Sequence, residues 1–242
     1  MATGIDLHQA ALTAIRSDPR IGPHFKPDLL EIDNEGTATI EAVVENVAIK
    51  RLALERLAAL PGIGAIVDRL RVKPAMAMSD DGIFDHLRKA YYGEPAFGRL
   101  TLKERYGDEV KLVREALPKA SGEIEFEVKH GVVILNGRVP SLASRRLAGV
   151  LAWWVPGSRD VINGIVVDPP EDDAPIQIEE AVRIALEKDP LIEASQIRVG
   201  VRDRTVRLTG LVRSAASRDA AEWDAWYVSG VDDVRNEIEI AP

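Results

Sequence analysis

Two similar stretches of nine residues lie 73 positions apart in this sequence, and this internal repeat constrains the fold more than any other feature. The segment Gly137 to Arg145 aligns with Gly210 to Arg218. The same register continues to Trp153 and Trp226 and beyond them. Positions that the copies share serve the fold, whereas residues found in only one copy are where a specific function is expected.

A third, more diverged copy lies 95 positions before the middle one, where Gly36 matches Gly131 and Gly62 matches Gly157. The chain of 242 residues therefore divides into three repeats. Each repeat has roughly 60 to 70 residues, a size that buries only about 60% of the unfolded surface. We therefore expect packing between repeats to contribute to stability.

Apolar residues recur at helical spacing near the start of each copy, over Leu7 to Ile15, Val110 to Leu117 and Ile178 to Leu186. A proline follows each run and ends the predicted helix. Two strands of alternating apolar and polar residues come next, and their pattern is typical of a hairpin with one buried face. The predicted last strands are Ile66 to Val72, Val161 to Val167 and Val234 to Ile240.

A second helix is predicted between the hairpin and the last strand of each copy. A side-chain oxygen at its N-cap can accept a hydrogen bond from an unpaired backbone N–H, and a glycine at its end adopts left-handed backbone angles without a Cβ penalty. Gly137 and Gly210 are predicted to lie in turns before this helix. The predicted N-caps are Asn46, Ser141 and Ser214, and the predicted terminal glycines are Gly62, Gly157 and Gly230.

These patterns predict an α+β fold of three tandem α-β-β-α-β units, each a three-stranded sheet with two helices packed on one face. The predicted units span residues 4–73, 107–168 and 176–241. Residues 74–106 match nothing in the repeat and are predicted to form an aromatic connector with a short helix from Asp81 to Tyr91. The acidic segment Asp168 to Pro175 is predicted to be a stiff spacer.

Charge and cysteine content exclude several function classes. The net charge of −8 argues against nucleic acid, which a basic patch would have to bind, and it discourages binding to anionic lipid. The absence of cysteine excludes disulfides and thiol catalysis. No signal peptide or membrane span is predicted, so a cytoplasmic location is expected, or a periplasmic one if a leader has been removed.

No group of residues predicts catalysis, a cofactor or a metal site. The four histidines, His8, His24, His86 and His130, form no pair with ligand spacing. The cluster Asp80, Asp81, Asp85 and His86 is interpreted as the start of a helix, with acidic residues in its first turn. Glu171, Asp172 and Asp173 are interpreted as a solvated linker.

All four tryptophans lie on the second helices of the middle and last copies. Ala221, Ala225 and Val228 form a small-residue stripe that should face the sheet, and Trp223 and Trp226 lie roughly 140° to 160° away from it. We predict that these tryptophans pack between repeats or between subunits. Two alternatives remain: the tryptophans contact a partner or a lipid surface, or the helix face that points to the sheet has been misassigned. The candidate interface residues are Trp153, Trp154, Trp223, Trp226 and Tyr227.

The repeat resembles the BON domain, which combines a Gly-x-Val-x-Ser segment with a second helix ending in Gly-Val and a strand Asp-Val-x-Asn-x-Ile. The resemblance is strongest in the last copy, over Gly210 to Ser214 and Gly230 to Asn236. The middle copy has Ser158 where valine is usual, and the first has Ala42 and Asp68 where the family has glycine and asparagine. BON domains occur in bacterial outer-membrane and periplasmic proteins induced by osmotic stress, in secretin-like channels and in some potassium-binding proteins.

The resemblance implies a fold and a role in association or phospholipid binding, and it implies no activity. We predict a non-enzymatic association module related to osmotic or envelope stress, which acts through a protein or phospholipid surface. Self-association or packing between repeats is expected. A sensor that binds a small ligand or ion in a pocket between units is the alternative, and an enzyme ranks third because no convergent groups were found.

Overall fold

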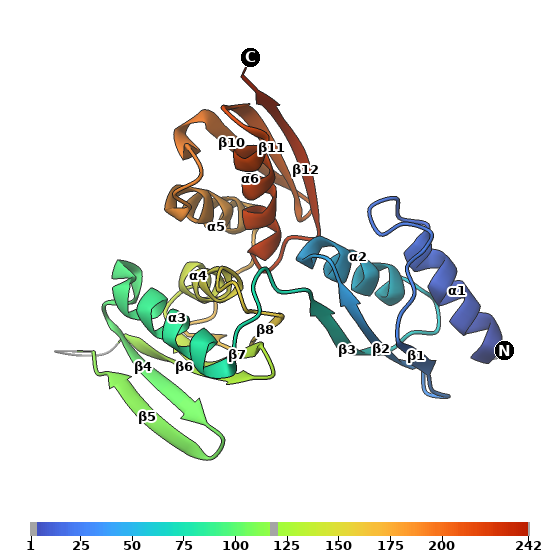
Figure 1. The fold of residues 1–242 in the computed structure, drawn as a ribbon, viewed down its shortest axis with the longest axis horizontal. Helices are drawn as coiled ribbons and strands as arrows, with labels where there is room; N and C mark the ends of the chain where they lie inside the picture. The colour runs from blue at the N-terminus through green and yellow to red at the C-terminus, as the bar shows by residue number, and fades with distance from the viewer. Residues whose placement is uncertain (1–3, 117–120, 242) are drawn as a thin grey trace. The chain divides into compact units, whose positions relative to one another are not determined.

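The computed structural model describes residues 4–116 and 121–241. The chain divides into two compact units, Met1–Lys73 and Pro74–Pro242 (Figure 1). The first unit holds the first repeat, and the second holds the other two. The α+β class and the layout in three repeats are confirmed, because three separate sheets form, each with its own helices.

The first repeat follows the predicted order of elements. Its sheet has the order β1-β2-β3, with β1 antiparallel and β3 parallel to β2. Ile15, Ile40, Leu52 and Leu70 are fully buried between the helices and the sheet. The elements are α1 (Gly4–Arg16), β1 (Leu29–Ile32), β2 (Thr37–Val44), α2 (Val47–Ala58) and β3 (Ala65–Val72).

The asparagine of the last strand has a structural role that the first repeat fills differently. In the middle and last repeats, Asn163 and Asn236 donate an amide N–H to a backbone carbonyl of the second helix, at 2.8 and 3.0 Å. Asp68 holds this position in the first repeat, and a carboxylate has no N–H to donate. It accepts a hydrogen bond from the buried Lys50 ammonium instead. The positive charge of Lys50 thus compensates for the carboxylate of Asp68 at this position.

The middle repeat is larger than predicted because residues 74–106 belong to its fold. Its six-stranded sheet has the order β5-β4-β6-β7-β8, with β9 also paired to β7. Strand β4 runs parallel to β6, and β5 forms the edge. The elements are α3 (Asp80–Gly93), the 3-10 helix η1 (Pro95–Phe97), β4 (Leu100–Tyr106), β5 (Glu109–Arg114), β6 (Gly122–Lys129), β7 (Val132–Val139), α4 (Leu142–Trp153), β8 (Asp160–Asn163) and β9 (Val166–Val167).

The helix predicted over residues 110–117 is wrong where the structure describes it. Residues Glu109–Arg114 form strand β5, whose backbone groups pair with β4. Leu117 and Pro118, also part of that prediction, lie outside the described residues. Helix α3 takes the place of the missing first helix, and its predicted start is close, with Ser79 as N-cap and Asp80 and Asp81 in the first turn.

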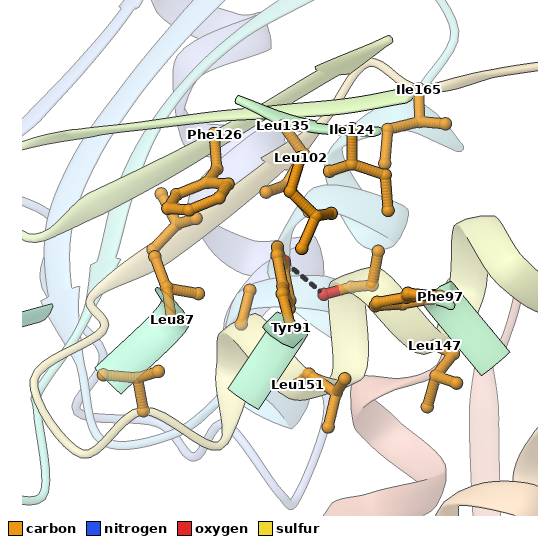
Figure 2. Close-up of a cluster of buried hydrophobic side chains, with 14 of the residues drawn as sticks. Leu87, Tyr91, Phe97, Leu102, Ile124, Phe126, Leu135, Leu147, Leu151 and Ile165 are labelled. Atoms are coloured by element: carbon orange, nitrogen blue, oxygen red, sulfur yellow. Dashed lines mark hydrogen bonds between the residues drawn. The ribbon is translucent and has the colours of Figure 1, made fainter. Parts of the chain in front are cut away.

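Aromatic side chains from residues 74–106 form the core of the middle repeat (Figure 2). Tyr91 is fully buried, and its ring meets the edges of Phe97 and Phe126 at centroid distances of 5.5 and 5.4 Å. The Tyr91 hydroxyl donates to the carbonyl of Ala148 on α4 at 2.8 Å. Outside the core, the Asp80 carboxylate accepts the backbone N–H groups of the β6–β7 turn. The predicted connector is therefore an integral part of this repeat.

The last repeat matches the predicted pattern closely. Its sheet has the order β10-β11-β12, and helices α5 and α6 pack against it and against each other. Val206, Leu208, Ala221 and Ala225 are fully buried in its core. The elements are α5 (Pro175–Lys188), the 3-10 helix η2 (Ala194–Gln196), β10 (Ile197–Arg202), β11 (Thr205–Val212), α6 (Ala215–Tyr227) and β12 (Asp233–Ile240).

The structure places the predicted caps at the starts of the second helices. The side chains of Asn46, Ser141 and Ser214 accept backbone N–H groups three residues later. Gly62 and Gly230, after the ends of α2 and α6, have a φ of +98°. Left-handed backbone angles of this kind favour glycine.

Three of the predicted glycines have other roles. Gly157 does not have a positive φ, so it is not needed for left-handed backbone angles. A Cβ at this position would lie 2.5 Å from Met78 Cβ. It allows the chain before α3 to come close to the loop after α4. Gly137 and Gly210 lie inside strands β7 and β11 rather than in turns. A Cβ at Gly137 would collide with the carbonyl of Glu123 on β6, and a Cβ at Gly210 would collide with the carbonyl of Gln196 in η2.

Candidate functional site

The helices of the middle and last repeats face one another within the second unit. Helix α4 contacts α3 of its own repeat and both α5 and α6 of the last repeat. Helix α4 ends at Trp153, with Trp154 as its C-cap, and the C-terminal half of α6 carries Asp224 and Tyr227. This meeting of helices is called the inter-repeat interface below.

A buried carboxyl group lies in the inter-repeat interface. Asp224 is 2% exposed, and its Oδ1 accepts a hydrogen bond from the indole Nε1 of Trp154 at 2.8 Å. Its Oδ2 has no hydrogen-bond partner among the described residues. Burial raises the pKa of Asp224 to about 8, against the Trp154 hydrogen bond that lowers it, and nearby Asp189 raises it further. The carboxyl group is therefore mostly protonated at neutral pH.

The first repeat has a residue of opposite charge, Arg56, at the position of Asp224. Asp18, which follows α1 as Asp189 follows α5, bonds to Arg20 and Arg56 at 3.1 and 3.0 Å. Hydrogen bonds from Arg20 and Arg56 hold the pKa of Asp18 at about 2. Arg56 is the counterpart of Asp224 in the repeat register. The last repeat has thus replaced an ion pair with two neighbouring carboxyl groups, which the fold does not require.

Aromatic stacking adds a second contact between the repeats. The rings of Trp153 and Tyr227 stack with a centroid distance of 5.9 Å and an angle of 13°. Burial, and next the charge of Asp224, raise the pKa of Tyr227 to about 12. Stacked aromatic pairs add roughly 1 kcal/mol beyond the area they bury. This pair joins α4 to α6.

Arg146 of α4 makes a third, polar contact. Its side chain is 2% exposed, and its Nε donates to the carbonyl of Ser229 in the last repeat at 2.8 Å. One of its terminal nitrogens bonds to Asp173 in the linker between the repeats. Glu171 of the same linker accepts the backbone N–H of Leu142 at the start of α4, at 2.8 Å. The linker is exposed as predicted, but two of its carboxylates are tied to the middle repeat.

The five candidate aromatic residues thus have different surroundings. Trp153, Trp154 and Tyr227 are brought together across the interface. Trp226 is buried, with an indole Nε1 that bonds to no described residue, and Trp223 is half-buried. That these residues anchor association stays a prediction.

Sequence reasoning missed the polar half of this interface, Arg146, Asp189 and Asp224. The one signal for it was the change from Arg56 in the first copy to Asp224 in the last, while an aspartate, Asp18 or Asp189, follows the first helix of both copies. Repeat comparison by residue identity alone passes over such a reversal of charge.

Within residues 4–116 and 121–241, no three side chains of His, Cys, Asp or Glu lie together as a metal site would need. No helix in this part of the chain is long and apolar enough to cross a membrane. Two hollows lie on the last repeat: one of about 660 Å³ beside Leu191 and Arg213, and one of about 520 Å³ beside Gly200 and Arg207.

Comparison with known proteins gives one informative match. The model of the BON domain family matches residues 110–169 and 176–242, which correspond to the middle and last repeats. No curated protein matches the chain. Two solved structures of CdsD, a structural protein of the type III secretion system of Chlamydia trachomatis, are similar at 14% identity. The first, its C-terminal domain, covers 100% of both chains with a TM-score of 0.26; the second covers 98% of this chain and 93% of that one with a TM-score of 0.25.

Proposed function

The chain belongs to the BON domain family, and we propose that it is a non-enzymatic association module that binds a second copy of itself or a phospholipid surface. The observation that carries this proposal is the inter-repeat interface. Trp154, Asp224 and Arg146 join the middle and last repeats through buried polar bonds. Two repeats held in this way act as one rigid body that offers an extended surface.

The sheet of the middle repeat offers the surface for association. Its helices α3 and α4 cover one face, and α4 is itself covered by α5 and α6. Apolar side chains remain exposed along the sheet, with Ile162 at 49% and Val166 at 56%. Exposed apolar residues that lie together mark interaction sites more often than isolated ones. Val110 and Leu112 are also exposed, but they lie on β5 at the opposite edge of the sheet.

The biological setting follows from the family. BON domains act in the bacterial envelope and in osmotic stress, and we propose a role of this kind for the chain. Cells that lack the gene should then grow more slowly at raised osmolarity, and the wild-type gene should restore growth.

The association itself is tested with the purified chain. Sedimentation velocity at rising concentration measures self-association, and co-sedimentation with vesicles of phosphatidylcholine and phosphatidylglycerol measures lipid binding. The double variant Ile162→Glu, Val166→Glu should lose whichever interaction the wild type shows, because charge on an apolar contact surface costs desolvation. Ile176→Glu is the matched control, since Ile176 is also exposed, at 63%, but lies on α5.

Two results would defeat the proposal. In the first, the wild type is monomeric at every concentration and does not sediment with vesicles that contain both phosphatidylcholine and phosphatidylglycerol. In the second, the control loses the interaction as completely as the double variant, which would mean that general apolar exposure causes it.

A further inference from the structure

A hollow of about 520 Å³ lies on the sheet of the last repeat, and its lining includes Gly200 and three exposed arginines. Gly200 of β10 pairs with Arg207 of β11, and Arg207 pairs in turn with Arg235 of β12. A Cβ at Gly200 would meet nothing within 4 Å. The missing side chain therefore opens the floor of the hollow, and Arg202 and Thr205 line its rim.

The other two repeats show that the fold does not require this arrangement. Arg207 and Arg235 correspond to Ile134 and Ile162 in the middle repeat and to Thr39 and Val67 in the first. The residue paired at the position of Gly200 is glutamate in both, namely Glu127 and Glu31. Only the last repeat removes the acid and adds the arginines, so this is a feature specific to one copy.

The lining of the hollow holds three arginines and one acid, and Glu237 lies beside it. Arg207 and Arg235 occupy neighbouring positions on adjacent strands, and like charges placed in this way destabilise a sheet. Glu237 binds Arg207 through Nε and Nη2, which holds that guanidinium in place and leaves Nη1 available. Asp203 is the one acidic residue in the lining, and it lies 3.5 Å from Arg202. The lining thus keeps an excess of positive charge in a chain whose net charge is −8.

We propose that this hollow binds a phosphate group, either free or carried on a larger molecule. A guanidinium donates two parallel N–H groups to an oxyanion, and a tetrahedral phosphate presents enough oxygens to engage several arginines at once. The Thr205 hydroxyl supplies one more donor. The site lies on a different repeat and a different sheet from the association surface, and it does not depend on the proposed function.

Three variants separate a built site from general positive charge. Arg235→Gln removes one of the arginines of the hollow. Gly200→Leu fills the hollow while keeping every charge, and the open space around Gly200 makes it compatible with the fold. Arg198→Gln is the matched control, because Arg198 is exposed on the same strand and its loss changes the net charge equally, but it does not line the hollow.

The probes are inorganic pyrophosphate, followed by calorimetry, and vesicles of phosphatidylcholine with and without phosphatidylglycerol, followed by co-sedimentation. Arg235→Gln and Gly200→Leu should each weaken binding roughly tenfold, whereas Arg198→Gln should stay within about twofold of the wild type. Binding of pyrophosphate alone would identify a soluble phosphate compound as the ligand. Binding of the anionic vesicles that Arg235→Gln weakens and Ile162→Glu, Val166→Glu leaves unchanged would identify a lipid headgroup bound in the hollow, whereas the reverse pattern would place lipid on the association surface and overturn this proposal. Thermal unfolding checks that each variant is folded. If Arg235→Gln does not fold, Gly200→Leu alone tests the proposal.

The proposal is overturned if the wild type binds neither probe. It is also overturned if Arg198→Gln weakens binding as much as Arg235→Gln, or if Gly200→Leu leaves binding unchanged, because diffuse charge would then explain the result.

Discussion

Asp224→Asn should stabilise the second unit at neutral and alkaline pH, although it alters a fully buried residue. An asparagine keeps the carbonyl oxygen that accepts the Trp154 indole N–H, and its amide can donate to the carboxylate of Asp189. The wild-type carboxyl group must instead either bind a proton or carry a buried charge beside Asp189. The substitution removes that cost.

The size and sign of the effect follow from the pKa of Asp224. It rises from 3.8 to about 8 on folding, so the folded state holds a proton that the unfolded state has released between those pH values. The free energy of unfolding of the wild type therefore falls as pH rises from about 4 to about 8 and is constant above that range. Each unit of pKa is worth about 1.4 kcal/mol, so the variant should gain on the order of 4 kcal/mol near pH 7 and almost nothing below pH 4.

Urea denaturation followed by tryptophan fluorescence measures this difference. All four tryptophans lie in Pro74–Pro242, so the signal follows the second unit alone. Asp203→Asn is the control, because its side chain is 90% exposed and its backbone φ of +48° is one that asparagine tolerates. The reasoning is refuted if Asp224→Asn destabilises the unit at every pH, or if its difference from the wild type does not change with pH.

Three further substitutions test individual contacts. Gly230→Val should lower the thermal midpoint and cost more than about 1 kcal/mol, because a β-branched residue must adopt a φ of +98° and its Cβ would lie 3.0 Å from Arg146 Nη2; an unchanged midpoint would remove Gly230 from this role. Lys50→Met should cost on the order of 2 kcal/mol in the first unit by removing the ammonium group that neutralises Asp68, and adding Asp68→Asn should recover most of that loss in circular dichroism melts; no recovery would mean that the two residues are independent. Tyr91→Phe should cost about 1 kcal/mol in urea denaturation, since it removes the buried hydrogen bond from the Tyr91 hydroxyl to the carbonyl of Ala148, and a neutral result would contradict the role of that hydrogen bond.

Most of the fold could be predicted because the repeat gives each element three times. The caps at Asn46, Ser141 and Ser214 and the last strands depend on local chemistry, which the sequence carries directly. The prediction of a helix over residues 110–117 failed because the spacing of Val110 and Leu112 also fits a strand. The neighbouring strand β4 pairs with this segment through backbone hydrogen bonds and so selects the strand. Local spacing cannot show which of two allowed structures has a partner.

The candidate site was predictable only in part. The aromatic residues off the core stripe drew attention to α4 and α6, because large apolar groups need cover. The contact between Trp154 and Asp224 depends on how two repeats dock, and no pattern within a single repeat encodes that geometry. The role of Gly157 was hidden for the same reason, since its close neighbour Met78 belongs to a segment outside the repeat.

Nuclear spin relaxation of backbone amides measures most directly whether the middle and last repeats form one rigid body. The account predicts a single rotational correlation time for the amides of α3 to β9 and of α5 to β12, because buried bonds from Arg146 and Trp154 join them. The double variant Arg146→Ala, Trp154→Phe should split this into two shorter times. Two separate correlation times in the wild type would contradict the account, since each repeat would then tumble independently of the other.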